Sequence, residues 1–111
     1  MADATTTVGA LKDAAGTFAA ERRWAPFHTP KNLAMALACE VGELLEPLRW
    51  LTGEESLAAC QDPATRAAIA DEVADVFNLL MLFSLHSGID VSDAMTAKLA
   101  KNARKYPPPA E

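Results

Sequence analysis

The stretch PKNLAMALACEVGELLEPLRWL, residues 30–51, predicts a helix that carries carboxylates on its apolar side. Thr29 can cap its start, and proline suits position 30, where the first turn needs no backbone N–H. Leu33 and Leu37 recur at helical spacing, and Glu40 shares their face. Carboxylates are seldom placed on a face that packs into a core. The stretch therefore indicates a helix that faces the core and whose carboxylates have a role other than solvation.

A second acidic pair, Glu72 and Asp75 in DEVADVF, has the same i, i+3 spacing as Glu40 and Glu43. Each pair thus presents both carboxylates on one helix face. In an antiparallel hairpin, residues equidistant from the turn face each other, and positions 40 and 75, like 43 and 72, are centred on the 51–63 connection. We expect all four acids at one level. The alternative is two solvated pairs, since Glu favours helices and is usually exposed.

Four carboxylates at one level repel one another, so a cation is expected between them. Oxygen ligands alone favour Mg²⁺, or Mn²⁺, over zinc, and neither acidic pair has the E-x-x-H form of di-iron bundles. Mg²⁺ held by few carboxylates usually completes its shell with substrate phosphates, which predicts a phosphorylated small molecule as ligand. His86, near the end of a later helix, is interpreted as a partner of the C-terminal helix dipole.

Two tryptophans are candidates for the walls of a nucleotide-base pocket. Trp50 stands seven residues after Glu43. On a continuous helix this is about two turns, or roughly 10 Å, along the same face, which is near the reach from phosphate to base. Trp24, closely followed by His28, could form a second wall. Packing of either tryptophan between helices is the alternative.

The last expected helix carries a basic face that could neutralise the outer phosphates. Lys98, Asn102 and Lys105 follow one another at i, i+4 and i+7, so they lie on one side. A solvated basic face is the alternative.

Composition bounds the class of protein. At 111 residues and 50% apolar content the chain is expected to form one domain, and its net charge of −5 argues against nucleic-acid binding. Cys39 and Cys60 lack C-x-x-C spacing, and no segment has the pattern of a signal peptide or a membrane span. A reduced, cytoplasmic protein is expected.

Strand signals are nearly absent, so the fold class is predicted as an all-α bundle of about four helices. Residues 1–17 are a lead-in with the start of the first helix, 18–106 the domain and 107–111 a Pro-rich tail. Residues 77–85 are apolar on almost every side, which indicates an oligomer. The helices are expected at about 8–23, 30–51, 63–87 and 91–105, with a kink near Pro47.

Three blocks of the chain resemble one known family. FAAERRWAPFHTPKNLAMALACEVGELLEPLRW, DEVADVF and KLAKNARKYP, within residues 18–107, are similar to the all-α MazG-like nucleoside triphosphate pyrophosphohydrolases, and most to their dCTP pyrophosphatase group. The resemblance implies hydrolysis of a nucleoside triphosphate to the monophosphate and pyrophosphate, which clears unwanted nucleotides. It also implies a homodimer or homotetramer with sites between subunits. The chain departs from the dCTP-specific members at Ala15, where they carry histidine, and at Pro47.

By this resemblance, each of the residues singled out above acquires a role. Glu40, Glu43, Glu72 and Asp75 would bind Mg²⁺, and Glu43 or Glu72 would orient or deprotonate the attacking water. The resemblance implies substrate binding by Trp24, His28, Trp50, Lys98 and Asn102, and Lys105 is added as a candidate from its place on the basic face. Two other classes stay open: a helical interaction module, and a protein that binds a nucleotide without cleaving it.

Overall fold

Each α-helix begins at a Thr or Asp that caps it. The structure, a computed structural model, describes residues 1–110. It contains α1 (Val8–Glu21), the 3₁₀ turn η1 (Ala25–Phe27), α2 (Pro30–Leu45), α3 (Gly53–Ala59), α4 (Pro63–Ser87) and α5 (Val91–Lys105). At each α-helix start the capping side chain accepts a hydrogen bond from a backbone N–H three residues on, an interaction worth about 1 kcal/mol. The caps are Thr7, Thr29, Thr52, Asp62 and Asp90.

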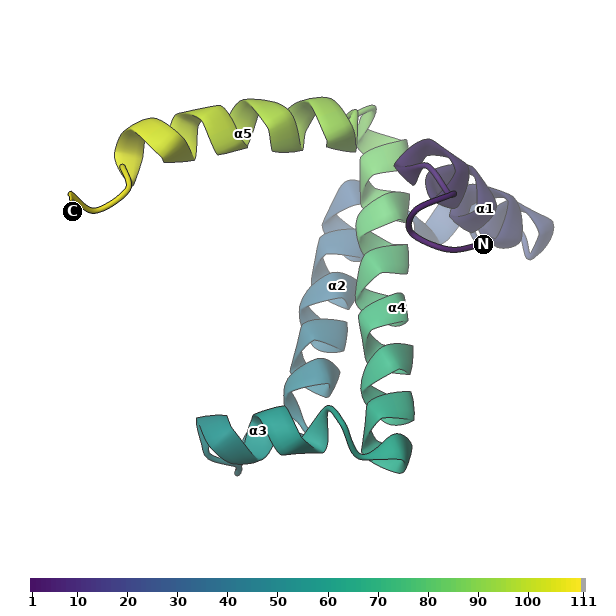
Figure 1. Cartoon of the computed structure of the whole chain (residues 1–111). Helices are drawn as coiled ribbons and strands as arrows, with labels where there is room; N and C mark the ends of the chain where they lie inside the picture. Colours follow the sequence, from purple (N-terminus) through teal and green to yellow (C-terminus); the bar gives the residue numbers. More distant parts are fainter. Residues whose placement is uncertain (111) are drawn as a thin grey trace.

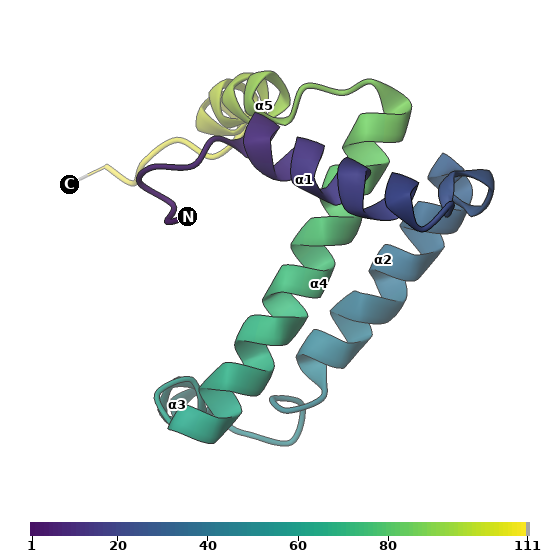
Figure 2. The same ribbon diagram turned by 90° about the vertical axis from the view of Figure 1, so that its right-hand side faces the viewer.

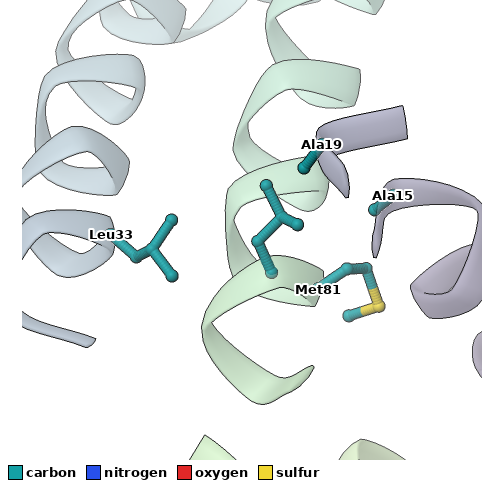
Figure 3. Close-up of a cluster of buried hydrophobic side chains, with 5 residues drawn as sticks. Ala15, Ala19, Leu33 and Met81 are labelled. Carbon is teal, nitrogen blue, oxygen red and sulfur yellow. The ribbon is translucent and has the colours of Figure 1, made fainter. Parts of the chain in front are cut away.

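The centre of the molecule is the antiparallel pair α2 and α4, which α1 crosses near one end (Figures 1 and 2). Leu33 reaches from α2 toward α4, while Met81 of α4 lies beside Ala15 of α1 (Figure 3). The small residues of α1 permit this close crossing. A Cβ added to Gly16 would lie 2.6 Å from a methyl of Leu85. The all-α prediction is confirmed: none of residues 1–110 forms a strand.

The second predicted helix ends earlier than expected. It was predicted to run to Leu51, but α2 stops at Leu45 and tight turns follow, in which Leu48 N–H donates to the Leu45 carbonyl at 2.9 Å. Pro47 has no N–H for the Glu43 carbonyl, so the helix ends rather than kinks. The helices predicted at 63–87 and 91–105 are confirmed.

One helix, α3, was not predicted. The segment TGEES was treated as a connection, yet Thr52 and Glu55 form a reciprocal capping box, in which each side chain accepts from the other's backbone N–H. The chain therefore has five α-helices in its described part, instead of about four.

The fifth helix, α5, projects away from the α2/α4 pair (Figure 1). The radius of gyration is 16.8 Å, whereas a compact domain of this length has about 13 Å. Among residues 1–110 only five apolar residues are buried, and much of the expected oligomer segment, including Phe77, Leu80 and Leu85, stays exposed. The isolated chain thus leaves a large apolar surface uncovered.

The chain ends follow the prediction as far as they are described. Residues 107–110 form no helix, and Glu111, the end of the predicted tail, lies outside the described residues. No helix within residues 1–110 is long and apolar enough to cross a membrane. The cytoplasmic location stays a prediction.

Candidate metal and nucleotide site

Three of the four predicted acids meet between α2 and α4. Carboxylate oxygens of Glu40 and Glu43 from α2 and of Glu72 from α4 lie within 4.8 Å of one another. The 17 residues between the two helices, 46–62, fold so that positions 43 and 72 face each other, and the predicted register is confirmed for these three glutamates. We call them, with Asp75, the carboxylate cluster.

Burial and mutual repulsion raise the pKa of two of these acids. For Glu40, desolvation is the largest cause of the raised pKa, followed by the hydrogen bond that its protonated form donates to Glu43 and by the charges of Glu43, Asp75 and Glu72. For Glu72, desolvation again comes first, and the charges of Glu43 and Asp75 follow. Asp75 thus acts on both through its charge, although it is exposed and lies outside the tightest group.

The cluster fits a hard divalent cation. One carboxylate oxygen each of Glu40 and Glu72 is buried and has no hydrogen-bond partner among residues 1–110. Buried acceptors normally find a donor, and no protein donor is present here for either oxygen. All ligand atoms on offer are carboxylate oxygens, which suit Mg²⁺ or Mn²⁺.

The aromatic residues form a row at the end of the hairpin near α1. The ring centroids of Phe18 and Trp24 are 5.8 Å apart, those of Trp24 and His28 6.1 Å, and those of His28 and His86 5.8 Å, all edge to face. Desolvation and the charge of His86 lower the pKa of His28, whose buried Nδ1 lacks a partner in the described part. The structure thus brings Trp24 and His28 together and gives His86 a ring contact besides its place in the last turn of α4.

Trp50 does not follow Glu43 on one continuous helix, as was predicted, because α2 ends at Leu45. Trp50 is 82% exposed, and the Arg49 guanidinium lies 4.6 Å from its ring centroid. Whether Trp50 contacts a base stays a prediction.

The predicted phosphate ligands lie apart from the cluster. Lys98, Asn102 and Lys105 belong to α5, which points away from the α2/α4 pair (Figure 1). The Lys105 ammonium lies 5.3 Å from the ring centroid of Tyr106, its neighbour in sequence. Within one chain these residues therefore do not join the carboxylates.

Two hollows that adjoin the carboxylate cluster were not predicted from the sequence. One, of about 490 Å³, lies between α1 and α4 and is lined by Asp75 and Asn78 among apolar residues. The other, of about 340 Å³, is lined by Glu43, Glu46 and Glu72 together with Pro47 and Ala68. The available signal was Asn78 itself, a polar residue three positions after Asp75 in an apolar run.

Comparison with known proteins agrees with this geometry. The dCTP pyrophosphatase 1 of Bos taurus is 40% identical over 90 residues, and that of Homo sapiens 41%, in each case over 81% of this chain and 53% of the relative. The chain therefore spans about half the length of these relatives. A crystal structure of a pyrophosphatase from Archaeoglobus fulgidus superposes with a TM-score of 0.82 at 34% identity, covering 88% of this chain and 90% of that one. No family model matches.

The all-helical fold, with three glutamates converging between two antiparallel helices, agrees with the fold of that pyrophosphatase. The chain belongs to the MazG-like all-α pyrophosphohydrolase family.

Proposed function

We propose that the chain is a Mg²⁺-dependent nucleoside triphosphate pyrophosphohydrolase. It would convert a nucleoside or deoxynucleoside triphosphate, dCTP-like or non-canonical, to the monophosphate and pyrophosphate, and so remove unwanted nucleotides. The observation that carries the proposal is the meeting of Glu40, Glu43 and Glu72 with two buried, unpartnered oxygens. The curated relatives, named dCTP pyrophosphatases, support the substrate class.

The ligands of the metal would be Glu40, Glu43, Glu72 and Asp75. Mg²⁺, or Mn²⁺, supplies charge neutralisation for the triphosphate and for the pyrophosphate that leaves. Its binding requires ionised carboxylates, and the raised pKa values of Glu40 and Glu72 make that requirement pH-dependent.

Glu43 or Glu72 would act on the attacking water. A raised carboxyl pKa makes Glu72 a better proton acceptor than an ordinary glutamate, and a carboxylate oxygen of Glu43 lies within 4.8 Å of one of its own. The carboxylate takes a proton from water, the water oxygen bonds to the α-phosphorus, and the bond from that phosphorus to the bridging oxygen breaks. Pyrophosphate leaves with the electron pair of that bond.

The substrate-binding residues are proposed to come from two chains. Trp24 and His28 would contact the base beside the hairpin, with Trp50 as a further wall. Lys98, Asn102 and Lys105 would hold phosphate from a neighbouring subunit, because α5 projects away from its own cluster (Figure 1).

Assembly into a homodimer or homotetramer would also bury the apolar surface that the single chain exposes. Exposed apolar side chains lie on both helices of the hairpin. They are Val41, Leu45, Val73, Phe77 and Leu80.

A panel of nucleoside triphosphates with Mg²⁺, assayed for pyrophosphate release, tests the proposal. At least one nucleotide should yield monophosphate and pyrophosphate, and excess EDTA should stop the reaction. If the chain binds a nucleotide but releases no product, it is a binding protein and not a hydrolase. If it binds no nucleotide and shows no Mg²⁺-dependent thermal shift, it is a helical interaction module.

A further inference from the structure

The corner at which α5 leaves α4 is held by a side chain from α1. The Lys12 ammonium donates a hydrogen bond to the Ile89 carbonyl at 2.7 Å. Every other side-chain hydrogen bond within residues 1–110 joins groups at most six residues apart, whereas this one spans 77 positions. Figures 1 and 2 show α1 crossing α4 near the end from which α5 departs. The bond therefore connects α1 to the junction of α4 and α5.

Lys12 differs from the other lysines of the chain in its surroundings. It is partly buried, whereas the remaining four are all exposed, namely Lys31, Lys98, Lys101 and Lys105. Ordering a lysine side chain costs rotamer entropy, so an exposed lysine usually stays mobile. Lys12 instead meets a carbonyl just beyond the end of α4, where the helix dipole favours a positive charge. No backbone N–H within residues 1–110 donates to that carbonyl, so Lys12 supplies its donor.

Little else in the described part of the chain fixes the direction of α5. None of the residues of α5 is buried, and Val91, its first residue, is the one that packs against the core. Gly88 turns the chain with a φ of 71°, and Asp90 caps the start of α5. These local features begin the helix but do not fasten it to another element. The bond from Lys12 to Ile89 is the side-chain hydrogen bond that does.

A small change at this corner is magnified along α5. Lys98 and Asn102 follow Val91 by seven and eleven residues, which correspond to about 10 and 16 Å along the helix axis. A tilt of about 10° at the corner would therefore displace them by roughly 2–3 Å. Hydrogen bonds to oxygen tolerate only a few tenths of an ångström around a length of about 2.9 Å, so such a displacement breaks a contact to phosphate.

We propose, on the basis of the proposed function, that Lys12 is a positioning residue for phosphate binding. Its bond to the Ile89 carbonyl sets the direction of α5, and thereby the place of Lys98 and Asn102 in the site of a neighbouring subunit. Lys12 acts through α5 and is not itself a ligand of the substrate. Because α5 is ordered before the substrate arrives, binding does not have to supply that order.

Hydrogen exchange of the assembled protein tests this role without any activity. Lys12→Met keeps the length of the side chain but removes the donor. The hydrogen-bonded amides at the corner should then exchange about fivefold faster, the factor expected for one lost hydrogen bond. They are the amides of Ile89, Asp93 and Ala94. Lys12→Arg, which still donates to a carbonyl, should restore slow exchange.

Lys31→Met is the matched control for this experiment. Lys31 is exposed on α2 and makes no side-chain hydrogen bond or ion pair within residues 1–110. Its substitution removes the same charge as Lys12→Met but leaves the corner intact. The corner amides of this variant should exchange as in the native chain.

Steady-state kinetics then separate positioning from stability. With a nucleotide that the chain hydrolyses, Lys12→Met should raise KM about three- to fivefold and change kcat less than about twofold, because the carboxylate cluster is untouched. The affinity of the cluster for Mg²⁺, measured by calorimetry without nucleotide, should equal that of the native chain. In a Lys98→Ala background the same substitution should raise KM by a smaller factor, since the contact that it positions is already lost.

Unchanged exchange at the corner in Lys12→Met, a KM that does not rise, or an effect that Lys12→Arg does not reverse would overturn the inference. An equal fall in kcat, Mg²⁺ affinity and melting temperature would also overturn it, because that pattern marks a general stabilising role. Lys12→Gln, which is shorter and uncharged, replaces Lys12→Met if that variant does not fold. If the native chain releases no pyrophosphate from any nucleotide, the proposed function fails, whereas faster exchange that Lys12→Arg reverses still supports the conclusion that Lys12 fixes α5.

Discussion

The sequence predicts the helices of the α2/α4 hairpin and also α5, but the two regions differ in packing. Within residues 1–110 the hairpin helices pack along each other, whereas α5 contributes only Val91, its first residue, to the core. The hairpin buries Leu33 against α4 and brings three glutamates together. In contrast, α5 keeps Met95 and Leu99 exposed and carries its basic residues away from the acids. Periodicity alone predicts a helix in both cases. The position of a helix in the fold depends on what covers its apolar side. For α5 we propose that a second copy of the chain covers it.

The largest expected effect is at the hairpin. Glu40→Gln or Asp75→Asn should reduce pyrophosphate release by roughly 10²-fold or more, because one charged group of the metal site is lost. The fold should be unchanged or, without metal, more stable, since a like charge is removed. Initial rates and thermal melts would check both, with Glu54→Gln, exposed in the first turn of α3, as control. Near-native turnover in either cluster variant is incompatible with the metal assignment.

The second effect contrasts the two regions in stability. Leu33→Ala should lower the free energy of unfolding by about 2–5 kcal/mol, because Leu33 is only 2% exposed and its loss leaves a cavity. Leu99→Ala, at a residue 54% exposed on α5, should instead shift the oligomer toward smaller species. Denaturant titration and sedimentation measure the two outcomes. If both variants affected only unfolding, α5 would have a packing partner within its own chain.

A third effect concerns sites shared between chains. Lys98→Ala should raise KM about tenfold through a lost charge-assisted contact to phosphate. Mixing this variant with inactive Glu40→Gln and allowing subunits to exchange should restore some sites. Each restored site would combine the intact carboxylate cluster of a Lys98→Ala chain with the intact α5 of a Glu40→Gln chain. Activity measured before and after exchange tests this. Activity equal to the average of the separate variants would place α5 at its own cluster.

These outcomes bear on what the sequence can predict. The starts of the helices were readable because capping residues and prolines at 30 and 63 act locally, and the meeting of Glu43 with Glu72 followed from a symmetric hairpin. The end of α2 was misjudged, although Pro47 was visible, because a proline can either kink or stop a helix and the choice depends on packing. The hollow between α1 and α4 could not be predicted, because it exists only where α1 crosses α4, and a polar residue such as Asn78 in an apolar run does not indicate that crossing.

The smallest expected effect is a pH response of the metal-free cluster. The folded-state pKa values of Glu40 and Glu72 are raised, so the folded chain takes up protons before the unfolded chain does. Their repulsion therefore destabilises the metal-free fold above the raised pKa values and is relieved as pH falls through them toward the ordinary pKa of a glutamate. The stability advantage of Glu40→Gln over the native chain should shrink over this range in melts with EDTA.

The comparison with Glu40→Gln removes contributions that both proteins share. The lowered pKa of His28 acts in the opposite direction, since the unfolded chain then binds the proton more readily as pH falls. If the difference in stability between Glu40→Gln and the native chain stayed constant with pH, the Glu40 carboxylate would not be destabilised by its neighbours in the cluster.

The central claim is cleavage at the innermost phosphorus, and hydrolysis in water enriched in oxygen-18 tests it most directly. With Mg²⁺ and a nucleotide that the chain hydrolyses, mass spectrometry should find the label in the nucleoside monophosphate and none in the pyrophosphate. Label in the pyrophosphate, or a diphosphate intermediate with free orthophosphate, would contradict attack at the α-phosphorus.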